Sequence, residues 1–332
     1  MKITLQNPLD MHLHLRDNQM LELVWPLSAQ YFSGAIVMPN LVPPVTTVEQ
    51  VISYKERITK ACEGEDFVPF MTLFFHEWLT RETLEQAKDV IHGVKLYPAG
   101  ITTNSENGAK EILTDKSRAI FSTMQELWIV LNIHWETNDF VMDREKNFIP
   151  IYEALAQEFP KLKIIMEHIT TKAACDVLDK YENLHATITL QHLLITLDDV
   201  AWWMLKPHLF CKPIAKRDED RDALCELAIT GHPKVMFGSD SAPHPQHAKE
   251  CCGCAAWVFT APIALQVLVE LFEKHDKLDN LEKFISLNAQ NIYKVEPIKK
   301  EIVLEKKEFI VPEKYWDVVP FMAWEKLAWS II

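Results

Sequence analysis

The sequence predicts an α/β fold, a (β/α)8 TIM-type barrel with a C-terminal extension, and three observations lead to this fold. Short runs of β-branched and apolar residues alternate with longer helix-like segments, as parallel strands alternate with crossover helices. Eight such runs are present, which is the number that closes a barrel of this type. The 332 residues, 48% of them hydrophobic, suffice for a barrel of about 250 residues, and no Pro/Gly/Ser-rich linker divides them.

The predicted strands are short, and most of them end near polar residues. They span residues 9–15, 35–38, 68–75, 93–97, 129–134, 163–168, 185–189 and 234–238. Helices are expected between them over residues 47–61, 81–90, 115–127, 150–159, 171–181 and 216–230, and after them over residues 261–275 and 281–289. Thr46 and Thr170 are expected as N-caps, because a threonine hydroxyl can accept a free amide of the first turn.

The chain is interpreted as one barrel domain over residues 1–296 and a C-terminal extension over residues 297–332. The extension is charged at first and then aromatic. We expect it to pack on the outside of the barrel or at a subunit contact.

Charge and hydropathy exclude several classes of protein. The formal net charge of -13 is spread along the chain, whereas nucleic-acid binding needs clustered Lys and Arg. No apolar run approaches the ~20 residues of a membrane span, and no export signal precedes the first strand. Seven mostly scattered cysteines then indicate reduced thiols. We therefore expect a cytoplasmic protein that binds neither nucleic acid nor membrane.

The first strand carries the pattern His12-Leu13-His14-Leu15-Arg16. A strand places alternate side chains on one face, so His12, His14 and Arg16 point the same way. Two imidazoles on one face can bind a single divalent metal. The alternative for so short a pattern is a pair of histidines on a solvated strand face.

Other polar residues support the metal site, because they too fall at or near strand ends. Barrel enzymes build their sites at the C-terminal ends of the strands, so these side chains are expected to converge on one mouth. They are Asn40, Lys95, His134, His168 and Asp240. Asp240 alone could be a turn or helix cap; within this set it is interpreted as a metal ligand and proton shuttle.

Lys95 lies inside a predicted barrel strand, where an unpaired ammonium is costly to bury. Three interpretations remain open: a neutral amine that forms a Schiff base, an ion pair with Asp or Glu, and a carbamate made with carbon dioxide. The carbamate is favoured, because an ammonium among four histidines would repel metal ions.

At this point the chain resembles the dihydroorotases, a family of the amidohydrolase superfamily, over nearly its whole length. The resemblance rests on six blocks in the right order: HLHLRD, MPNLVPPVTT, VKLYPAGITTNS, EHITT, PHLFCKP and GSDSAPH. Longer relatives carry an extra β-sandwich half before the first HxH motif. Only eleven residues precede His12, which is typical of the compact members.

The resemblance implies two zinc ions per subunit. One would be held by His12, His14 and Asp240 and the other by His134 and His168. Carbamylated Lys95 (N6-carboxylysine) and a hydroxide would bridge them.

The resemblance also implies a substrate-binding set. Arg16, Asn40 and His244 would hold a carboxylate, and Arg16 suits this task because its guanidinium can pair bidentately. Thr102 and Thr103 match a loop that closes over substrate, and Lys212 with Ala255 or Ala256 would offer backbone contacts. The full set is His14, Arg16, Asn40, Thr102, Thr103, His134, Lys212, His244, Ala255 and Ala256. Two positions depart from the family: Trp135 replaces a usual Gly after His134, and Lys212 replaces an apolar residue.

The implied activity is the reversible cyclisation of N-carbamoyl-L-aspartate to L-dihydroorotate in de novo pyrimidine (UMP) biosynthesis, by a homodimer whose partner is this small-molecule substrate. Asp240 would be the catalytic proton carrier. The nearest alternative is another cyclic amidohydrolase, such as a hydantoinase-like enzyme. A Schiff-base aldolase that uses Lys95 and a non-catalytic scaffold are further alternatives.

Overall fold

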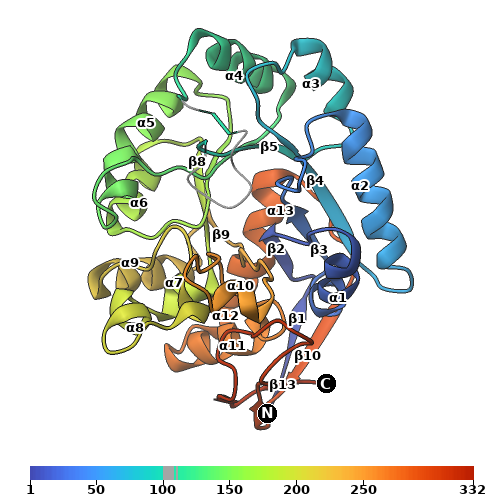
Figure 1. Ribbon diagram of the computed structural model, residues 1–332, viewed down its shortest axis with the longest axis vertical. Helices are drawn as coiled ribbons and strands as arrows, with labels where there is room; N and C mark the ends of the chain where they lie inside the picture. Colours follow the sequence, from blue (N-terminus) through green and yellow to red (C-terminus); the bar gives the residue numbers. More distant parts are fainter. Residues whose placement is uncertain (100–107, 110) are drawn as a thin grey trace.

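The computed structural model describes residues 1–99, 108–109 and 111–332, and its centre is a sheet of parallel strands surrounded by helices (Figure 1). Eight strands lie in this sheet in the order of the chain. They are β2 (Leu9–Leu13), β3 (Gly34–Val37), β4 (Val68–Phe74), β5 (Gly93–Leu96), β6 (Leu131–Ile133), β7 (Ile164–Met166), β8 (Leu184–Ile188) and β9 (Val235–Phe237). The predicted (β/α)8 barrel is therefore confirmed.

The first and last strands of this sheet meet just beyond their C-terminal ends. The amide of Asp240 donates to the carbonyl of His12 over 2.8 Å, and the amide of His14 donates to the carbonyl of Ser241 over 3.3 Å. These two hydrogen bonds form the seam that closes the barrel, and this seam lies beside the HxH motif.

All eight barrel strands end one or two residues earlier than predicted, and two of these ends concern the site. β7 ends at Met166 and β9 at Phe237, so His168 and Asp240 lie just past the strands. His168 has φ 41° and Asp240 has φ 48°. A positive φ turns the chain out of the extended conformation, which explains why the strand cannot continue through either residue.

Helices cover the outside of the barrel, most of them close to their predicted positions. The helices are α1 (Asn18–Ala29), α2 (Val48–Ala61), α3 (Arg81–Ala87), α4 (Asp115–Leu127), α5 (Arg144–Glu158), α6 (Lys172–Val177), α7 (Leu190–Leu194), α8 (Leu197–Ala201), α9 (Asp218–Ile229), α10 (Gln246–Lys249), α11 (Ala264–Lys274), α12 (Leu278–Glu282) and α13 (Asn288–Tyr293). Short 3-10 turns η1 (Leu178–Lys180) and η2 (Pro207–Leu209) and the π-helical turn η3 (Lys283–Leu287) complete them.

The start of α5 was predicted wrongly. The helix begins at Arg144 and carries Pro150 in its interior, whereas the sequence predicted a start at residue 150. The first turn is held by a long-range contact: the Glu145 carboxylate accepts hydrogen bonds from the amides of Thr170 and Thr171 at 2.8–3.0 Å. This contact stabilises helix upstream of the proline.

The two predicted N-caps are each displaced by one residue. Thr47 caps α2 and Thr171 caps α6, in place of Thr46 and Thr170. The hydroxyl of Thr170 donates to Glu145 over 2.7 Å. The hydroxyl of Thr171 also donates to Glu145, over 2.6 Å, and in addition accepts from the amide of Ala174.

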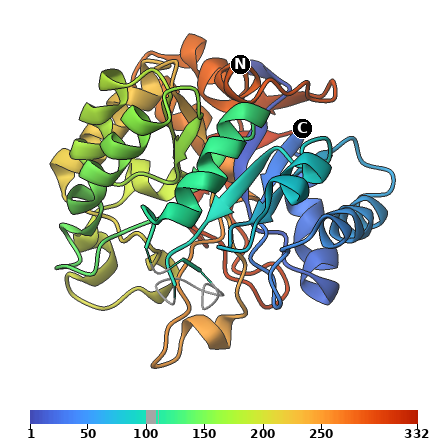
Figure 2. The same ribbon diagram turned by 90° about the horizontal axis from the view of Figure 1, so that it is seen from above.

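A second, smaller sheet joins the two ends of the chain. β1 (Lys2–Gln6) pairs antiparallel with β10 (Glu301–Glu305), which pairs with β13 (Ser330–Ile331). β11 (Phe309–Ile310) and β12 (Lys326–Leu327) form a separate two-stranded sheet. Trp329 of this region is buried, and its indole N–H donates to Glu273 over 3.0 Å. Figure 2 shows both chain ends on the side of the barrel away from the loop that carries α10. The division at residue 296 stays a prediction.

Two further findings concern membrane spans and cysteines in the part of the chain that the structure describes. None of its helices combines the length and the apolar character needed to cross a bilayer. All seven cysteines are free.

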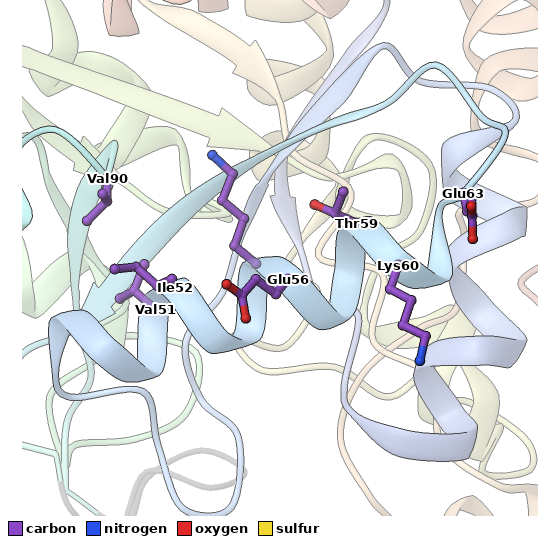
Figure 3. Close-up of a pocket in the computed structure, with 8 residues that line it drawn as sticks. Val51, Ile52, Glu56, Thr59, Lys60, Glu63 and Val90 are labelled. Atoms are coloured by element: carbon purple, nitrogen blue, oxygen red, sulfur yellow. The ribbon is translucent and has the colours of Figure 1, made fainter.

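A hollow of about 660 Å³ lies along the outer face of α2 (Figure 3). The residues that line it are Val51, Ile52, Lys55, Glu56, Thr59, Lys60, Glu63 and Val90. None of them belongs to the predicted site, so this hollow is separate from the chemistry at the strand ends.

Candidate active site

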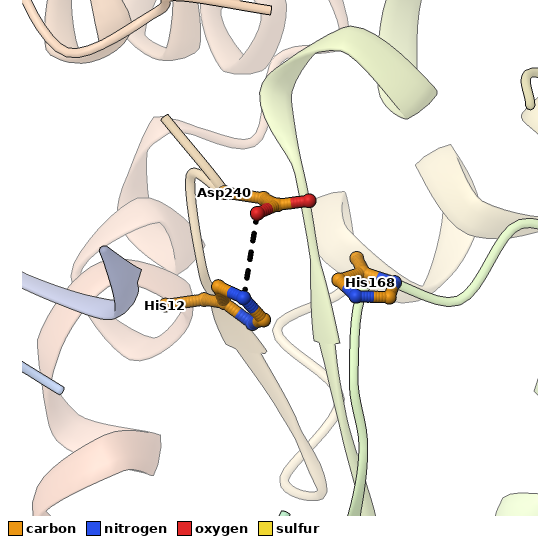
Figure 4. Close-up of side chains that lie close together, drawn as sticks. All are labelled: His12, His168 and Asp240. Carbon is orange, nitrogen blue, oxygen red and sulfur yellow. Dashed lines mark ion pairs between the residues drawn. The ribbon is translucent and has the colours of Figure 1, made fainter. Parts of the chain in front are cut away.

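Three buried side chains from three strand ends converge at the mouth of the barrel (Figure 4). His12 lies in β2, His168 follows β7 and Asp240 follows β9, and their ligand atoms all lie within 4.8 Å of one another. His12 Nε2 is 3.3 Å from Asp240 Oδ1. Imidazole nitrogens and carboxylate oxygens are common zinc ligands. The geometry therefore suits a divalent metal.

Two further histidines adjoin this group. His14 Nε2 lies 3.1 Å from the same oxygen of Asp240. His134 Nδ1 lies 2.8 Å from His168 Nε2, and the His12 and His168 rings are 5.0 Å apart. The ligand sets predicted for two metals therefore lie side by side.

Burial keeps the four imidazoles neutral at neutral pH. It lowers the pKa of His12 to about 4, with a smaller contribution from the charge of Lys95. Burial is also the main reason that the pKa values of His14, His134 and His168 fall well below the usual range. A neutral imidazole is the form that binds a metal, so no proton has to be removed first.

Several polar atoms at this centre have no hydrogen-bond partner among the described residues: Lys95 Nζ, His134 Nε2, His168 Nδ1 and Asp240 Oδ1. Burial also raises the pKa of Asp240 well above its usual range. A bound cation would give the imidazole nitrogens a partner and favour the ionised carboxylate of Asp240. The residues present thus fit a metal centre.

The carboxylate of Glu167 lies directly beneath this centre. It accepts hydrogen bonds from His12 Nδ1 at 2.7 Å, Asn132 Nδ2 at 2.8 Å and Thr187 Oγ1 at 2.7 Å. Burial alone would raise the pKa of Glu167, but the charge of Lys95, the interaction with His12 and the hydrogen bond from Thr187 outweigh burial and hold it at about 2. An ionised Glu167 keeps the proton of His12 on Nδ1, which leaves Nε2 free to face Asp240 and a metal.

Lys95 points from β5 into the barrel and is completely buried. Its Nζ lies 3.7 Å from Glu167 Oε1, which is an ion-pair distance but too long for a hydrogen bond. Burial lowers the pKa of Lys95 to about 8. The lower pKa increases the neutral fraction of the amine, and the neutral amine is the form that reacts with carbon dioxide or a carbonyl.

Asp10 ties the HxH strand to the segment after β9. Its carboxylate accepts from the amide of His12 at 3.1 Å, the amide of Ser239 at 2.8 Å and the hydroxyl of Ser239 at 2.5 Å. Gly238 lets the segments approach this closely, because a Cβ there would lie 2.9 Å from the Cβ atoms of His12 and Thr187. The position of Asp240 depends on this seam.

Arg16 and His244 of the predicted carboxylate-binding set are in contact, with Arg16 Nη2 3.1 Å from His244 Nε2. The Tyr54 hydroxyl donates to the carbonyl of Arg16 over 2.7 Å and supports its backbone at φ 58°. Asn40 hydrogen-bonds the side chain of His14. Three residues predicted to bind an anion therefore lie next to the metal ligands.

The remaining predicted contacts lie on two hydrogen-bonded segments. The amide of Trp257, next to Ala256, donates to the carbonyl of Phe210 over 2.8 Å, and Lys212 follows two residues later. The Trp257 ring centroid lies 5.8 Å from that of His14, at the mouth. Predicted residues Thr102 and Thr103 lie outside the described residues.

Trp135 leaves the strand end intact. The amide of His134 donates to the carbonyl of Leu96 over 3.0 Å, which continues the pairing of β6 with β5. The Trp135 ring stacks on Phe148 of α5, with centroids 5.8 Å apart. The departure from the family's usual glycine is therefore accommodated outside the metal site.

Three residues of the site were not predicted from the sequence. Asp10 precedes the HxH motif by two positions, and the two-residue period that grouped His12 with His14 could have included it. Glu167 neighbours a predicted ligand, but strict alternation places it on the opposite face. Trp257 carried no signal in the sequence.

Comparison with known proteins identifies the family. The amidohydrolase family profile matches residues 69–295. Dihydroorotase of Helicobacter hepaticus is 45% identical over 99% of this chain and 97% of its own. A crystal structure of dihydroorotase from Campylobacter jejuni has a TM-score of 0.95 and 56% identity, and covers 99% of this chain and 97% of its own. Saccharomyces cerevisiae dihydroorotase in complex with 5-fluoroorotic acid has a TM-score of 0.93 and 36% identity over 100% and 98%.

The chain belongs to the dihydroorotase family. It is thereby a hydrolase that acts on cyclic amides, in a family whose members depend on a metal. The hydantoinase-like alternative is not better supported, because dihydroorotases match at high identity over the full length.

We predict that Glu167→Gln weakens metal binding by about 10- to 100-fold, because His12 loses the charged partner that orients it. Competition with a chelator, followed by measurement of retained zinc, tests this. Glu273→Gln is the matched control, because Glu273 binds Lys306 and Trp329 away from the mouth. Equal zinc retention in the two variants would contradict the role of Glu167.

Proposed function

We propose that the chain is a zinc-dependent dihydroorotase that interconverts N-carbamoyl-L-aspartate and L-dihydroorotate in de novo pyrimidine biosynthesis. The observation that carries the proposal is the buried group of four neutral imidazoles around Asp240 and Lys95, beside an Arg16–His244 pair suited to a carboxylate. A metal-activated attack on a cyclic amide and recognition of a carboxylate are the two requirements of this reaction.

Two zinc ions would be held by the predicted sets, His12, His14 and Asp240 on one side and His134 and His168 on the other. Lys95 would be a shared ligand in its carbamylated form. In support, its partly neutral buried amine lies among the imidazoles, and carbamylation removes the positive charge that opposes metal binding.

Bound zinc supplies hydroxide at neutral pH and polarises the carbonyl under attack. The residues of the chain supply the rest. Asp240 Oδ1, which faces two imidazoles, would take the proton of the attacking hydroxide and deliver it to the ring nitrogen that leaves. In ring closure the same oxygen would take a proton from the attacking nitrogen and return it to the hydroxide that leaves.

Arg16, Asn40 and His244 would hold the substrate carboxylate. Burial is the main cause that lowers the pKa of His244 to about 3, and the charge of Arg16 adds to it. His244 is therefore neutral, and the positive charge of this pocket belongs to Arg16. Backbone groups near Lys212, Ala255 and Ala256 would contact the ring, with His14 and His134 beside it and Thr102 and Thr103 closing over it.

A homodimer and a cytoplasmic location are proposed as well. Both rest on the family resemblance and on the place of the reaction in pyrimidine biosynthesis.

Purified, zinc-loaded protein is expected to turn over L-dihydroorotate, with loss of ultraviolet absorbance. A chelator should abolish turnover and zinc should restore it, because the imidazoles and Asp240 alone supply no hydroxide at neutral pH. Turnover of a hydantoin but not of dihydroorotate, by protein shown to hold metal, would favour the alternative cyclic amidohydrolase.

We predict that Lys95→Ala prevents the binding of two zinc ions, because it removes the shared ligand. Metal content per chain measures this, and the intact mass of the wild type should include one carbon dioxide that the variant lacks. Full occupancy by two zinc ions in the variant would refute the carbamate.

Arg16→Ala is expected to raise KM for dihydroorotate by about 30-fold or more at unchanged zinc content, since loss of one partner of a buried charged pair costs about 2 kcal/mol or more. Arg57→Ala serves as its control, because Arg57 pairs with Asp17 at the surface. Loss of zinc in Arg16→Ala would show instead that Arg16 supports the metal site.

A further inference from the structure

A buried lysine joins the two segments at the mouth of the barrel. Lys249, the last residue of α10, is only 4% exposed. Its Nζ donates to the carbonyl of Phe210 at 3.1 Å and to the carbonyl of Trp257 at 2.6 Å. The amide of Trp257 donates to the same Phe210 carbonyl at 2.8 Å. These three hydrogen bonds therefore set the distance between the segment around Phe210 and the segment around Trp257.

Both segments carry groups proposed to contact the substrate. Lys212 lies two residues after Phe210, and Ala256 directly precedes Trp257. The amide of Ala255 donates to the carbonyl of Ala248 over 2.8 Å, which attaches this segment to α10 as well. A shift of the Lys249 side chain would therefore change the distance between the two sets of backbone groups that are proposed to contact the substrate ring.

The hydrogen bonds of Lys249 also support the position of the Trp257 ring, which lies beside the metal ligands. The Trp257 ring centroid lies 5.8 Å from that of His14, 5.9 Å from that of His134 and 6.1 Å from that of His168. Trp257 has φ 115°, a conformation rare for a residue with a side chain. The hydrogen bond from Lys249 to the carbonyl of Trp257 is one of the contacts that maintain it.

The charge of Lys249 also reaches the carboxylate-binding pair. After burial and Arg16, Lys249 is the third cause that lowers the pKa of His244. A cation in this position adds positive potential to a pocket meant for an anion.

We propose that Lys249 is a positioning residue for substrate binding, which holds the backbone segments around Phe210 and Trp257 at the spacing that the cyclic substrate requires. The proposal rests on the proposed dihydroorotase function. Lys249 acts through the two carbonyl groups and does not itself touch the reacting atoms.

The test compares Lys249→Met with wild type in the zinc-loaded full chain. KM for dihydroorotate should rise on the order of tenfold, because the binding groups are no longer held in place. The turnover number at saturation and the zinc content should stay within about a factor of three, since metal ligands and Asp240 are untouched. An unchanged KM would overturn the proposal, even if the variant melted at a lower temperature.

Lys234→Met is the matched control. Lys234 Nζ also donates to two backbone carbonyls, those of Leu178 and Tyr181, each at 2.9 Å. It directly precedes β9 and so lies at the opposite end of the barrel from the mouth. An equal rise in KM in Lys234→Met would assign the effect to general loosening and would overturn the proposal.

Lys249→Gln provides a second variant if Lys249→Met is insoluble. It keeps a donor for one carbonyl, so a smaller rise in KM in the same direction is expected. Insolubility of both variants would assign Lys249 to folding and would also overturn the proposal. Lack of dihydroorotate turnover by the wild type would contradict the proposed function itself. This outcome can therefore be distinguished from one that contradicts only the role of Lys249.

Discussion

An ionised carboxylate in the interior of the barrel organises the whole site. Burying a charge is costly unless hydrogen bonds and an opposite charge satisfy it, and Glu167 receives both. Its partners come from four different strands: His12 from β2, Lys95 from β5, Asn132 from β6 and Thr187 from β8. The ring orientation of His12 and the location of Lys95 are therefore coupled, because a displacement of either one leaves Glu167 less well satisfied.

Much of the architecture could be predicted because its signals are local. Strands and their order follow from runs of a few residues, and the rule that barrel sites form at strand ends then brings distant histidines together. The details that the sequence did not predict depend on contacts between residues that are far apart in the chain. The start of α5 before Pro150 depends on Glu145 reaching across to the segment after β7.

Backbone conformation accounts for the missed residue at the centre. Alternation along a strand separates Glu167 from His168, but the positive φ at His168 breaks the period, and both side chains then contact or face His12. The sequence offers no local sign of this break. Likewise, the pairing of β1 with β10 joins residues near opposite ends of the chain, and neither strand shows an alternation strong enough to reveal it alone.

The seam between Asp10 and Ser239 spans 229 positions of the chain, which has a consequence for the order of events during synthesis. Until β9 and the segment after it leave the ribosome, β2 and β8 have free edges, and such edges are prone to pair with other chains. Asp240 arrives with that same segment. A nascent chain that has not yet closed its barrel therefore has only part of the proposed ligand set to offer a metal.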